Sequence, residues 1–147
     1  MTTTHFEIES YVGALPIRFG MQQSDVEAIL GEPERKATNF FKELNYIYEC
    51  VSIGFDKNKS VAHVGFLPGA NVDYDGQPMF LQETFRQLLR LDGEAKEVVG
   101  CVVLLKLGIA FDGFHDGDES QKAVSVFVRG TYDNVSHKMK DFMLDTA

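Results

Sequence analysis

Ile17-Arg-Phe-Gly-Met-Gln-Gln-Ser-Asp-Val-Glu-Ala-Ile-Leu-Gly-Glu-Pro33 is the stretch that decides the fold, because it holds the signals for one complete short helix. Ser24 is a good N-cap, and Glu27 lies three positions further on, as in a capping box. Gly31 and Pro33 then end the helix. The apolar positions in between lie on one helical face, which a sheet is expected to cover: Val26, Ile29 and Leu30.

Strand patterns flank this helix on both sides. Before it, His5 to Ser10 alternates apolar and polar residues as a short strand does. After the polar stretch Glu32 to Asn39, the residues Leu44 to Phe55 predict strands, and Val61 to Leu67 predicts a returning strand. Asp56 to Ser60 supplies the turn, so the first half is expected to end in a β-hairpin.

The second half follows a comparable order. Pro68 to Pro78, rich in Gly, Asn, Asp and Pro, is the predicted connection. A helix ending before Gly93 is expected next, then one long or two short strands over Val98 to Phe111 and a returning strand over Ala123 to Arg129. The apolar positions of that helix have helical spacing: Phe80, Leu81, Phe85, Leu88 and Leu89.

A short helix is predicted at the C-terminus, over residues 133–144. Asp133 or Asn134 would cap it. Its apolar stripe would consist of Val135, Met139, Phe142 and Met143.

The two halves also share a local string. Ser52-Ile-Gly-Phe-Asp56 precedes one turn, and Gly108-Ile-Ala-Phe-Asp112 precedes the other. The spacing from Leu30 to Phe55 is 25 residues, and that from Leu89 to Phe111 is 22. We therefore predict a single domain, residues 1–147, with internal repeats of about 11–70 and 71–130, although short apolar strings that end in Asp also recur by chance.

The opening helix resembles a known family. Ile17-Arg-Phe-Gly-Met21, then Val26, then Leu30-Gly-Glu-Pro33 is similar to the start of the BamE/SmpA-like and beta-lactamase-inhibitor-protein-like repeat, I-x-x-G-M-x-x-x-x-V-x-x-x-L-G-x-P. The resemblance implies an α+β fold of two tandem helix-plus-β-hairpin units that form an antiparallel sheet. It also implies helices packed on one face, the other face open for recognition, and a role in binding rather than catalysis.

Charge and composition limit the classes of partner that the chain can bind. The formal net charge is -8 and the sequence pI is about 4.9, which opposes binding to nucleic acid and favours a basic partner. Neither an export leader nor a membrane span is evident, so we expect a cytoplasmic protein without membrane contact. Cys50 and Cys101 each lie among apolar neighbours, which predicts two reduced thiols and neither a disulfide nor a metal site.

No sequence motif indicates catalysis. None of the four histidines is paired in sequence with a Cys, Ser or carboxylate in a recognisable catalytic string, and no glycine-rich phosphate loop occurs. We therefore predict a protein that is not an enzyme and needs no cofactor. A Cys-His or His-Asp pair assembled from distant positions is the alternative that only a structure can test.

The loop Asp112-Gly-Phe-His-Asp-Gly-Asp-Glu119 is chemically distinctive, with four carboxylates and no Lys or Arg. It does not match the calcium-loop pattern. Three interpretations remain: a solvated hairpin tip, an acidic contact surface for a basic partner, or a metal site. Phe114 favours the contact surface, because exposed aromatic residues often anchor interfaces.

Together these features favour an immunity protein that neutralises a cognate bacterial toxin by occluding its active site. A nuclease of the type VI secretion or contact-dependent class would be the natural target, because its substrate is polyanionic. The alternatives are a non-inhibitory binding or assembly module, such as a homodimer, and a small-ligand-binding protein. The predicted partner-binding residues are Asp112, Phe114, His115, Asp116, Asp118, Glu119, Asp73, Tyr74 and Asp75. For the last three, solvated loop charges are the alternative.

Overall fold

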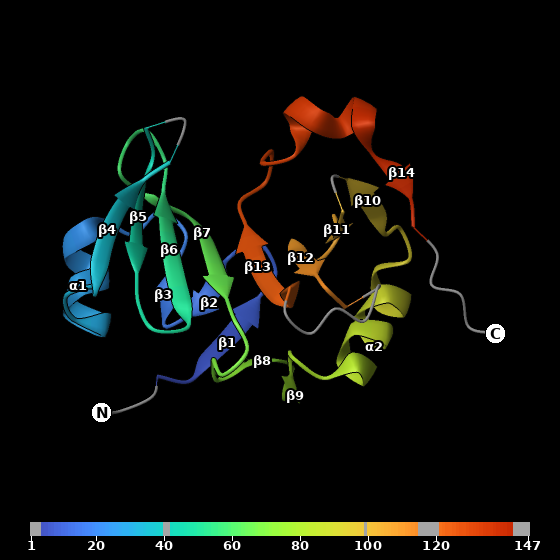
Figure 1. Cartoon of the computed structure of the whole chain (residues 1–147), viewed down its shortest axis with the longest axis horizontal. Helices are drawn as coiled ribbons and strands as arrows, with labels where there is room; N and C mark the ends of the chain where they lie inside the picture. Colours follow the sequence, from blue (N-terminus) through green and yellow to red (C-terminus); the bar gives the residue numbers. More distant parts are fainter. Residues whose placement is uncertain (1–3, 40–41, 99, 115–120, 143–147) are drawn as a thin grey trace.

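The computed structural model describes residues 4–39, 42–98, 100–114 and 121–142, and it is an α+β fold made mostly of sheet (Figure 1). Two helices, α1 (Gln23–Leu30) and α2 (Gln82–Asp92), each precede four strands of one large sheet. The strands after α1 are β4 (Arg35–Thr38), β5 (Leu44–Ile47), β6 (Val51–Phe55) and β7 (Val61–Phe66). The strands after α2 are β10 (Lys96–Val98), β11 (Cys101–Leu104), β12 (Ile109–Asp112) and β13 (Ala123–Phe127).

The large sheet has nine strands in the order β14-β10-β11-β12-β13-β7-β6-β5-β4, and each neighbouring pair is antiparallel. β7 and β13, the last strands of the two four-strand runs, pair at its middle, with Val64 opposite Val126. The strings shared by the two halves lie in β6 and β12, which are each the third strand after a helix.

A second sheet of five strands, in the order β3-β2-β1-β8-β9, lies across the large one. Its central pair, β1 with β8, is parallel, so the molecule is not antiparallel throughout. Its strands are short: β1 (Phe6–Glu9), β2 (Gly13–Leu15), β3 (Ile17–Arg18), β8 (Val72–Tyr74) and β9 (Gln77–Pro78).

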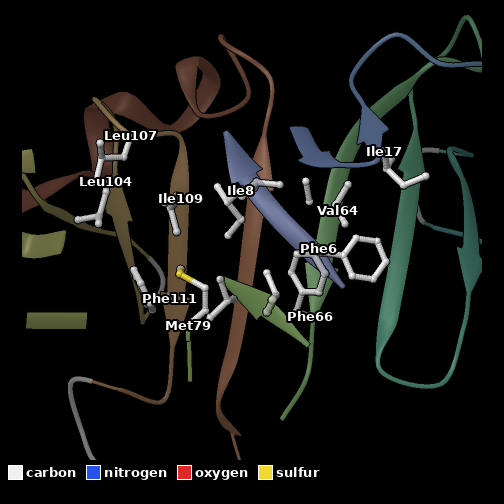
Figure 2. Close-up of a cluster of buried hydrophobic side chains, with 14 of the residues drawn as sticks. Phe6, Ile8, Ile17, Val64, Phe66, Met79, Leu104, Leu107, Ile109 and Phe111 are labelled. Carbon is white, nitrogen blue, oxygen red and sulfur yellow. The ribbon is translucent and has the colours of Figure 1, made fainter. Parts of the chain in front are cut away.

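One main core lies between the large sheet and the layer formed by the small sheet and both helices. Figure 2 shows Phe6 and Ile8 of β1 over β7 and β13, with Val64 and Phe66 beneath them. Val26 of α1 and Phe85 of α2 belong to the same cluster. The alternating apolar positions of the large sheet therefore face the helices, as the period of a half-buried strand requires.

A smaller apolar cluster lies on the opposite face of the large sheet. It contains Val98, Val103, Ala110 and Phe127, which are buried. Tyr132, Val135 and Met139 pack against it from the segment that follows β13. This segment, residues 128–139, covers the helix-free face over β10 to β13.

The ends of both helices lie close to those predicted from the sequence, but the N-cap of α1 is a different residue. α1 ends at Gly31 and α2 ends at Gly93, as expected. The N-cap of α1 is Gln22 rather than Ser24, because Asp25 accepts a hydrogen bond from the Gln22 backbone N–H (3.0 Å) and completes a capping box there.

The C-terminal helix expected over residues 133–144 is shorter and of another type in the described residues up to 142, which corrects the expected apolar stripe. A 3-10 helix, η2 (Asp133–Lys138), is followed by a short edge strand, β14 (Lys140–Asp141). Val135 and Met139 pack on the cluster of the helix-free face, whereas Phe142 packs against the main core. The chain crosses the sheet edge between them, so these residues cannot form one helical stripe. Met143 lies outside the described residues.

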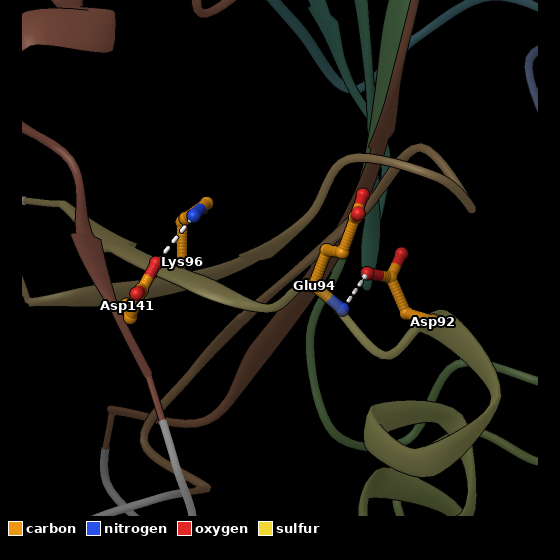
Figure 3. Close-up of polar contacts among 4 residues, drawn as sticks. All are labelled: Asp92, Glu94, Lys96 and Asp141. Atoms are coloured by element: carbon orange, nitrogen blue, oxygen red, sulfur yellow. Dashed lines mark hydrogen bonds and ion pairs between the residues drawn. The ribbon is translucent and has the colours of Figure 1, made fainter.

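Asp92 ties the end of α2 to the turn between β11 and β12. Its side chain is buried, with 1% of its surface exposed. One carboxylate oxygen accepts the backbone N–H groups of Lys106 (2.9 Å) and Leu107 (3.1 Å), and the other accepts that of Glu94 (3.0 Å; Figure 3). Three backbone donors thus depend on one buried carboxylate.

We expect Asp92→Ala to lower the free energy of unfolding by about 3 kcal/mol, because it leaves buried N–H groups without an acceptor. Chemical denaturation measures this loss. The matched control is Asp141→Ala, which removes the partner of Lys96 in an exposed ion pair (Figure 3) and should have a much smaller effect. Equal losses in the two variants would contradict the structural role of Asp92.

Candidate partner-binding surface

The helix-free face of the large sheet has a floor of small residues at its centre. Ser52 of β6, Gly65 of β7 and Ser125 of β13 lie opposite one another in one cross-strand row. Each alternates with buried apolar residues of the main core, so these three positions point away from the helices. The row continues to Ala110 of β12, which is already part of the covered cluster.

Two hollows lie on this face and share the side chain of His63. The first, which we call the strand hollow, has a volume of about 410 Å³ and extends over β6, β7 and β13. The second, the loop hollow, has a volume of about 730 Å³ and lies between the ends of β5 and β6 and the segment 128–134. Both are open depressions of a surface that the helices do not cover.

The His63 ring lies close to the sheet because two glycines leave room for it. A Cβ on Gly54 would lie 3.2 Å from the Cβ of His63, and a Cβ on Gly65 would lie 3.3 Å from its Cε1. Surrounding protein lowers the pKa of this imidazole by burial. Within the described ranges its ring nitrogens have no hydrogen-bond partner, so they are available to a ligand in either hollow.

A thiol, a carboxylate and a phenol meet at the edge of the covered cluster. Burial raises the pKa of the Cys101 thiol to about 12, and the neighbouring Asp112 carboxylate adds to that shift. Tyr132 contacts the same thiol. A thiol with this pKa stays protonated near neutral pH, so Cys101 is poorly suited to act as a nucleophile.

The strand hollow also brings together Cys50, His63 and Asp112, which are the residue types of a catalytic triad. The Cys50 thiol, however, donates a hydrogen bond to the Pro68 carbonyl (3.6 Å) and makes none to His63. The geometry therefore does not activate the thiol through the imidazole. Both cysteines are unpaired thiols.

The acidic loop is only partly described. Asp112 lies at the end of β12 and lines the strand hollow, as does Ala123 where the chain returns. His115, Asp116, Asp118 and Glu119 lie outside the described residues. Phe114 is a correction to the expected exposed anchor: only 2% of its surface is exposed, because it packs among Phe80, Phe85 and Phe111.

The residues Asp73, Tyr74 and Asp75 belong to a different surface. Tyr74 and Asp75 line a third hollow of about 500 Å³ beside β1 of the small sheet. The Asp73 carboxylate lies within hydrogen-bond distance of His5 Nε2 (2.8 Å). This hollow shares no lining residue with the strand hollow, so Tyr74 and Asp75 do not line the same hollow as Asp112.

The sequence analysis did not identify Ser52, Gly65 and Ser125 as surface-site residues, although the alternation of small and buried residues in their strands was a signal for them. Ser52 and Gly54 alternate with buried residues in β6, and Ser125 does the same in β13. Small residues at every second position of adjoining strands predict one open sheet face. Across residues 4–39, 42–98, 100–114 and 121–142, no group of three or more His, Cys, Asp or Glu is placed to hold a metal ion. Neither helix in that part of the chain is long and apolar enough to cross a membrane.

Comparison with known proteins identifies no family. No family model matches the chain, and no curated protein matches it. Among solved structures, the chain is similar to an extracellular protein containing an SCP domain from Bacillus anthracis str. Ames, with a TM-score of 0.52 and 11% identity. The likeness covers 90% of this chain and 51% of that one, so the chain spans about half the length of that protein. At this identity the likeness concerns the fold alone.

The lowered pKa of His63 predicts a loss of stability in acid. The unfolded chain, with an ordinary histidine pKa of 6.5, takes up a proton before the folded protein does, so acidification below that value favours unfolding. The loss attributable to His63 is at most about 1.4 kcal/mol for each pH unit. Denaturation at several pH values should show a shallower decline for His63→Gln than for the wild type.

The carboxylates and bases that line the two hollows are present in both the wild type and His63→Gln. These groups are Glu43, Glu49, Asp56, Lys57, Asp112 and Arg129. The difference between their curves of stability against pH therefore gives the contribution of His63 alone. Parallel curves for the two proteins would contradict a lowered pKa at this position.

Proposed function

We propose that this chain is a protein-binding inhibitor, an immunity protein that holds part of a basic toxin against the helix-free face of its large sheet. The observation that carries the proposal is the row of Ser52, Gly65 and Ser125, which lines the strand hollow, with the loop hollow next to it. A strand face bearing small side chains lets a partner approach the sheet backbone closely. Inhibition would follow from occlusion of the partner's active site.

Charge supports a basic partner. The chain has a formal net charge of -8, which accelerates the encounter with a protein of opposite charge. Asp112 lies at the end of β12 and lines the strand hollow, and in the sequence it is the first of the four carboxylates of residues 112–119. A nuclease is the natural target, and a cytoplasmic location belongs to the same proposal.

Binding rather than catalysis is the activity that these side chains support. Cys101 has a raised pKa, and the Cys50 thiol hydrogen-bonds a backbone carbonyl instead of His63. Neither arrangement offers an activated nucleophile. A non-inhibitory module or a homodimer remains the alternative, for which the exposed edge strand β4 offers a pairing edge.

We also propose that the two halves are structural repeats related by duplication. Each half runs from one helix through four strands of the large sheet, and the similar strings occupy the third strand of each run. The units are therefore longer than a helix plus a hairpin, because β4 and β10 precede the strands that the sequence indicated.

The test uses a partner that co-purifies with the chain from its source organism. We expect Ser125→Arg to weaken its binding about tenfold or more in surface plasmon resonance, because the long side chain fills the floor. The control Ala28→Arg adds the same charge to the exposed surface of α1 and should leave the affinity unchanged. Circular dichroism checks that both variants fold.

Inhibition is measured separately, by titrating the wild-type chain into the partner's own activity. Loss of that activity at one equivalent supports an immunity role, whereas tight binding without inhibition favours the non-inhibitory module. Unchanged binding by folded Ser125→Arg would reject this surface. Co-purification of the chain with itself alone, at the mass of two copies, would favour the homodimer.

A further inference from the structure

The hollow beside β1, which we call the β1 hollow, lies on the outer face of the small sheet and has a volume of about 500 Å³. Phe6 and Ile8 of β1 are buried in the main core, whereas Glu7 and Glu9 alternate with them and are exposed. The two carboxylates therefore point away from the large sheet. Leu15 lies opposite Glu7 in the β1–β2 pair and lines the same hollow.

The acidic side chains of this hollow have no cation to balance them. Glu7, Glu9 and Asp75 line it, and none of them makes an ion pair among the residues that the structure describes. The described lining contains no Lys or Arg. Arg18 of β3 lies in the same cross-strand row as Glu9, beyond Gly13, but forms no ion pair with it. The hollow is thus free to attract a cation from outside the chain.

A buried hydroxyl group of the same hollow also lacks a partner. Ser10, which follows β1, lines the hollow, and its hydroxyl oxygen is buried. This oxygen makes no hydrogen bond within the part of the chain that the structure describes. A buried hydroxyl without a partner costs free energy, which a ligand that donates a hydrogen bond would recover. Independently of the carboxylates, this oxygen therefore indicates a ligand with donor groups.

The hollow has an apolar side as well. Leu91 of α2 lines it with 61% of its surface exposed, and Leu15 and Tyr74 line it too. An apolar segment that covers these side chains gains free energy from the hydrophobic effect. The matching ligand therefore combines an apolar stem with a positively charged hydrogen-bond donor.

We infer that the β1 hollow binds a lysine side chain of a partner protein, with its apolar stem on Leu15 and Leu91 and its ammonium group among the three carboxylates. The ammonium group carries three donors and no acceptor, so it can also supply the hydrogen bond that Ser10 lacks. This hollow is separate from the helix-free face of the large sheet. The inference thus goes beyond the proposed function and does not depend on it.

Lysine fits this hollow better than arginine for two physical reasons. Its stem can cover apolar surface while the ammonium group stays in contact with water. The ammonium group is also the more strongly hydrated of the two cations, and the carboxylates of Glu7, Glu9 and Asp75 are exposed, so both charges keep much of their water. A guanidinium group, in contrast, gains most where planar, bidentate contacts are enclosed.

The first test titrates small probes into the isotopically labelled whole chain at pH 7.5 and follows NMR shifts. The probes are acetyl-Gly-Lys-Gly-amide, its Arg counterpart, its norleucine counterpart, which keeps the stem without the charge, and methylammonium chloride, which keeps the charge without the stem. With the Lys peptide we expect saturable shifts of the Glu9, Ser10 and Asp75 amides and of the Leu91 methyl groups. The Arg peptide should bind more weakly, and the other two probes should give no saturable shift.

The inference is overturned if the Lys peptide gives no saturable shift at these residues. It is also overturned if the Arg peptide, the norleucine peptide or methylammonium binds as tightly as the Lys peptide. Ser125→Arg, on the helix-free face, should leave binding of the Lys peptide unchanged. Loss of binding in that variant would place the lysine in the strand hollow and reject the β1 hollow.

Two substitutions test the apolar and the charged part of the hollow separately. Leu91→Ala should weaken the Lys peptide about threefold, whereas Leu81→Ala, at a leucine that is 52% exposed and does not line the hollow, should not. Glu9→Gln should weaken it about twofold to fivefold, whereas Glu34→Gln removes an exposed charge elsewhere and should not. Equal effects within either pair would count against the inference.

The source of the lysine is tested with the co-purified partner. A zero-length carbodiimide reagent joins carboxylates directly to lysine amines, so it should link Glu7, Glu9 or Asp75 to a lysine of the partner, as mass spectrometry of the digested complex would show. Links from other carboxylates alone would reject the contact. A link here together with unchanged partner binding by Ser125→Arg would support this inference while the proposed interface on the large sheet fails.

Discussion

The antiparallel pairing of β7 with β13 is the constraint on which the rest of the structure depends. It joins the strand run after α1 to the run after α2, so that one sheet spans both halves. Its register places Val64 and Val126 toward the helices and Gly65 and Ser125 away from them. A slip of one residue would turn the apolar set to solvent and bury the small polar set, so core formation and the open face depend on the same alignment.

Local signals in the sequence predicted the local structure well. The glycines after Leu30 and Asp92 ended both helices, and the strands β6 and β7 lie where alternating apolar residues indicated a hairpin. These features depend on neighbours within a few residues, which periodicity and capping chemistry describe directly. The α+β class followed from them.

Features that depend on distant contacts could not be predicted in the same way. Phe114 lies in a polar loop by sequence, yet it is buried because Phe85 and Phe111 come to the same place in the fold. The apolar stripe after Asp133 has helical spacing, but its residues pack on opposite faces of the sheet. The strand hollow was hidden for the same reason, since its floor is assembled from three strands that are separated in sequence.

The segment 128–139 makes the two halves of the sheet unequal. It lies over the helix-free side of β10 to β13, where Val103 and Phe127 are buried beneath Tyr132 and Met139. On the other half of the sheet, Ser52 and Gly65 line the strand hollow instead. A sheet built from two similar runs would otherwise present two comparable docking faces. Because the chain itself covers one of them, only the half over β6 and β7 keeps small residues at the surface among the described strands.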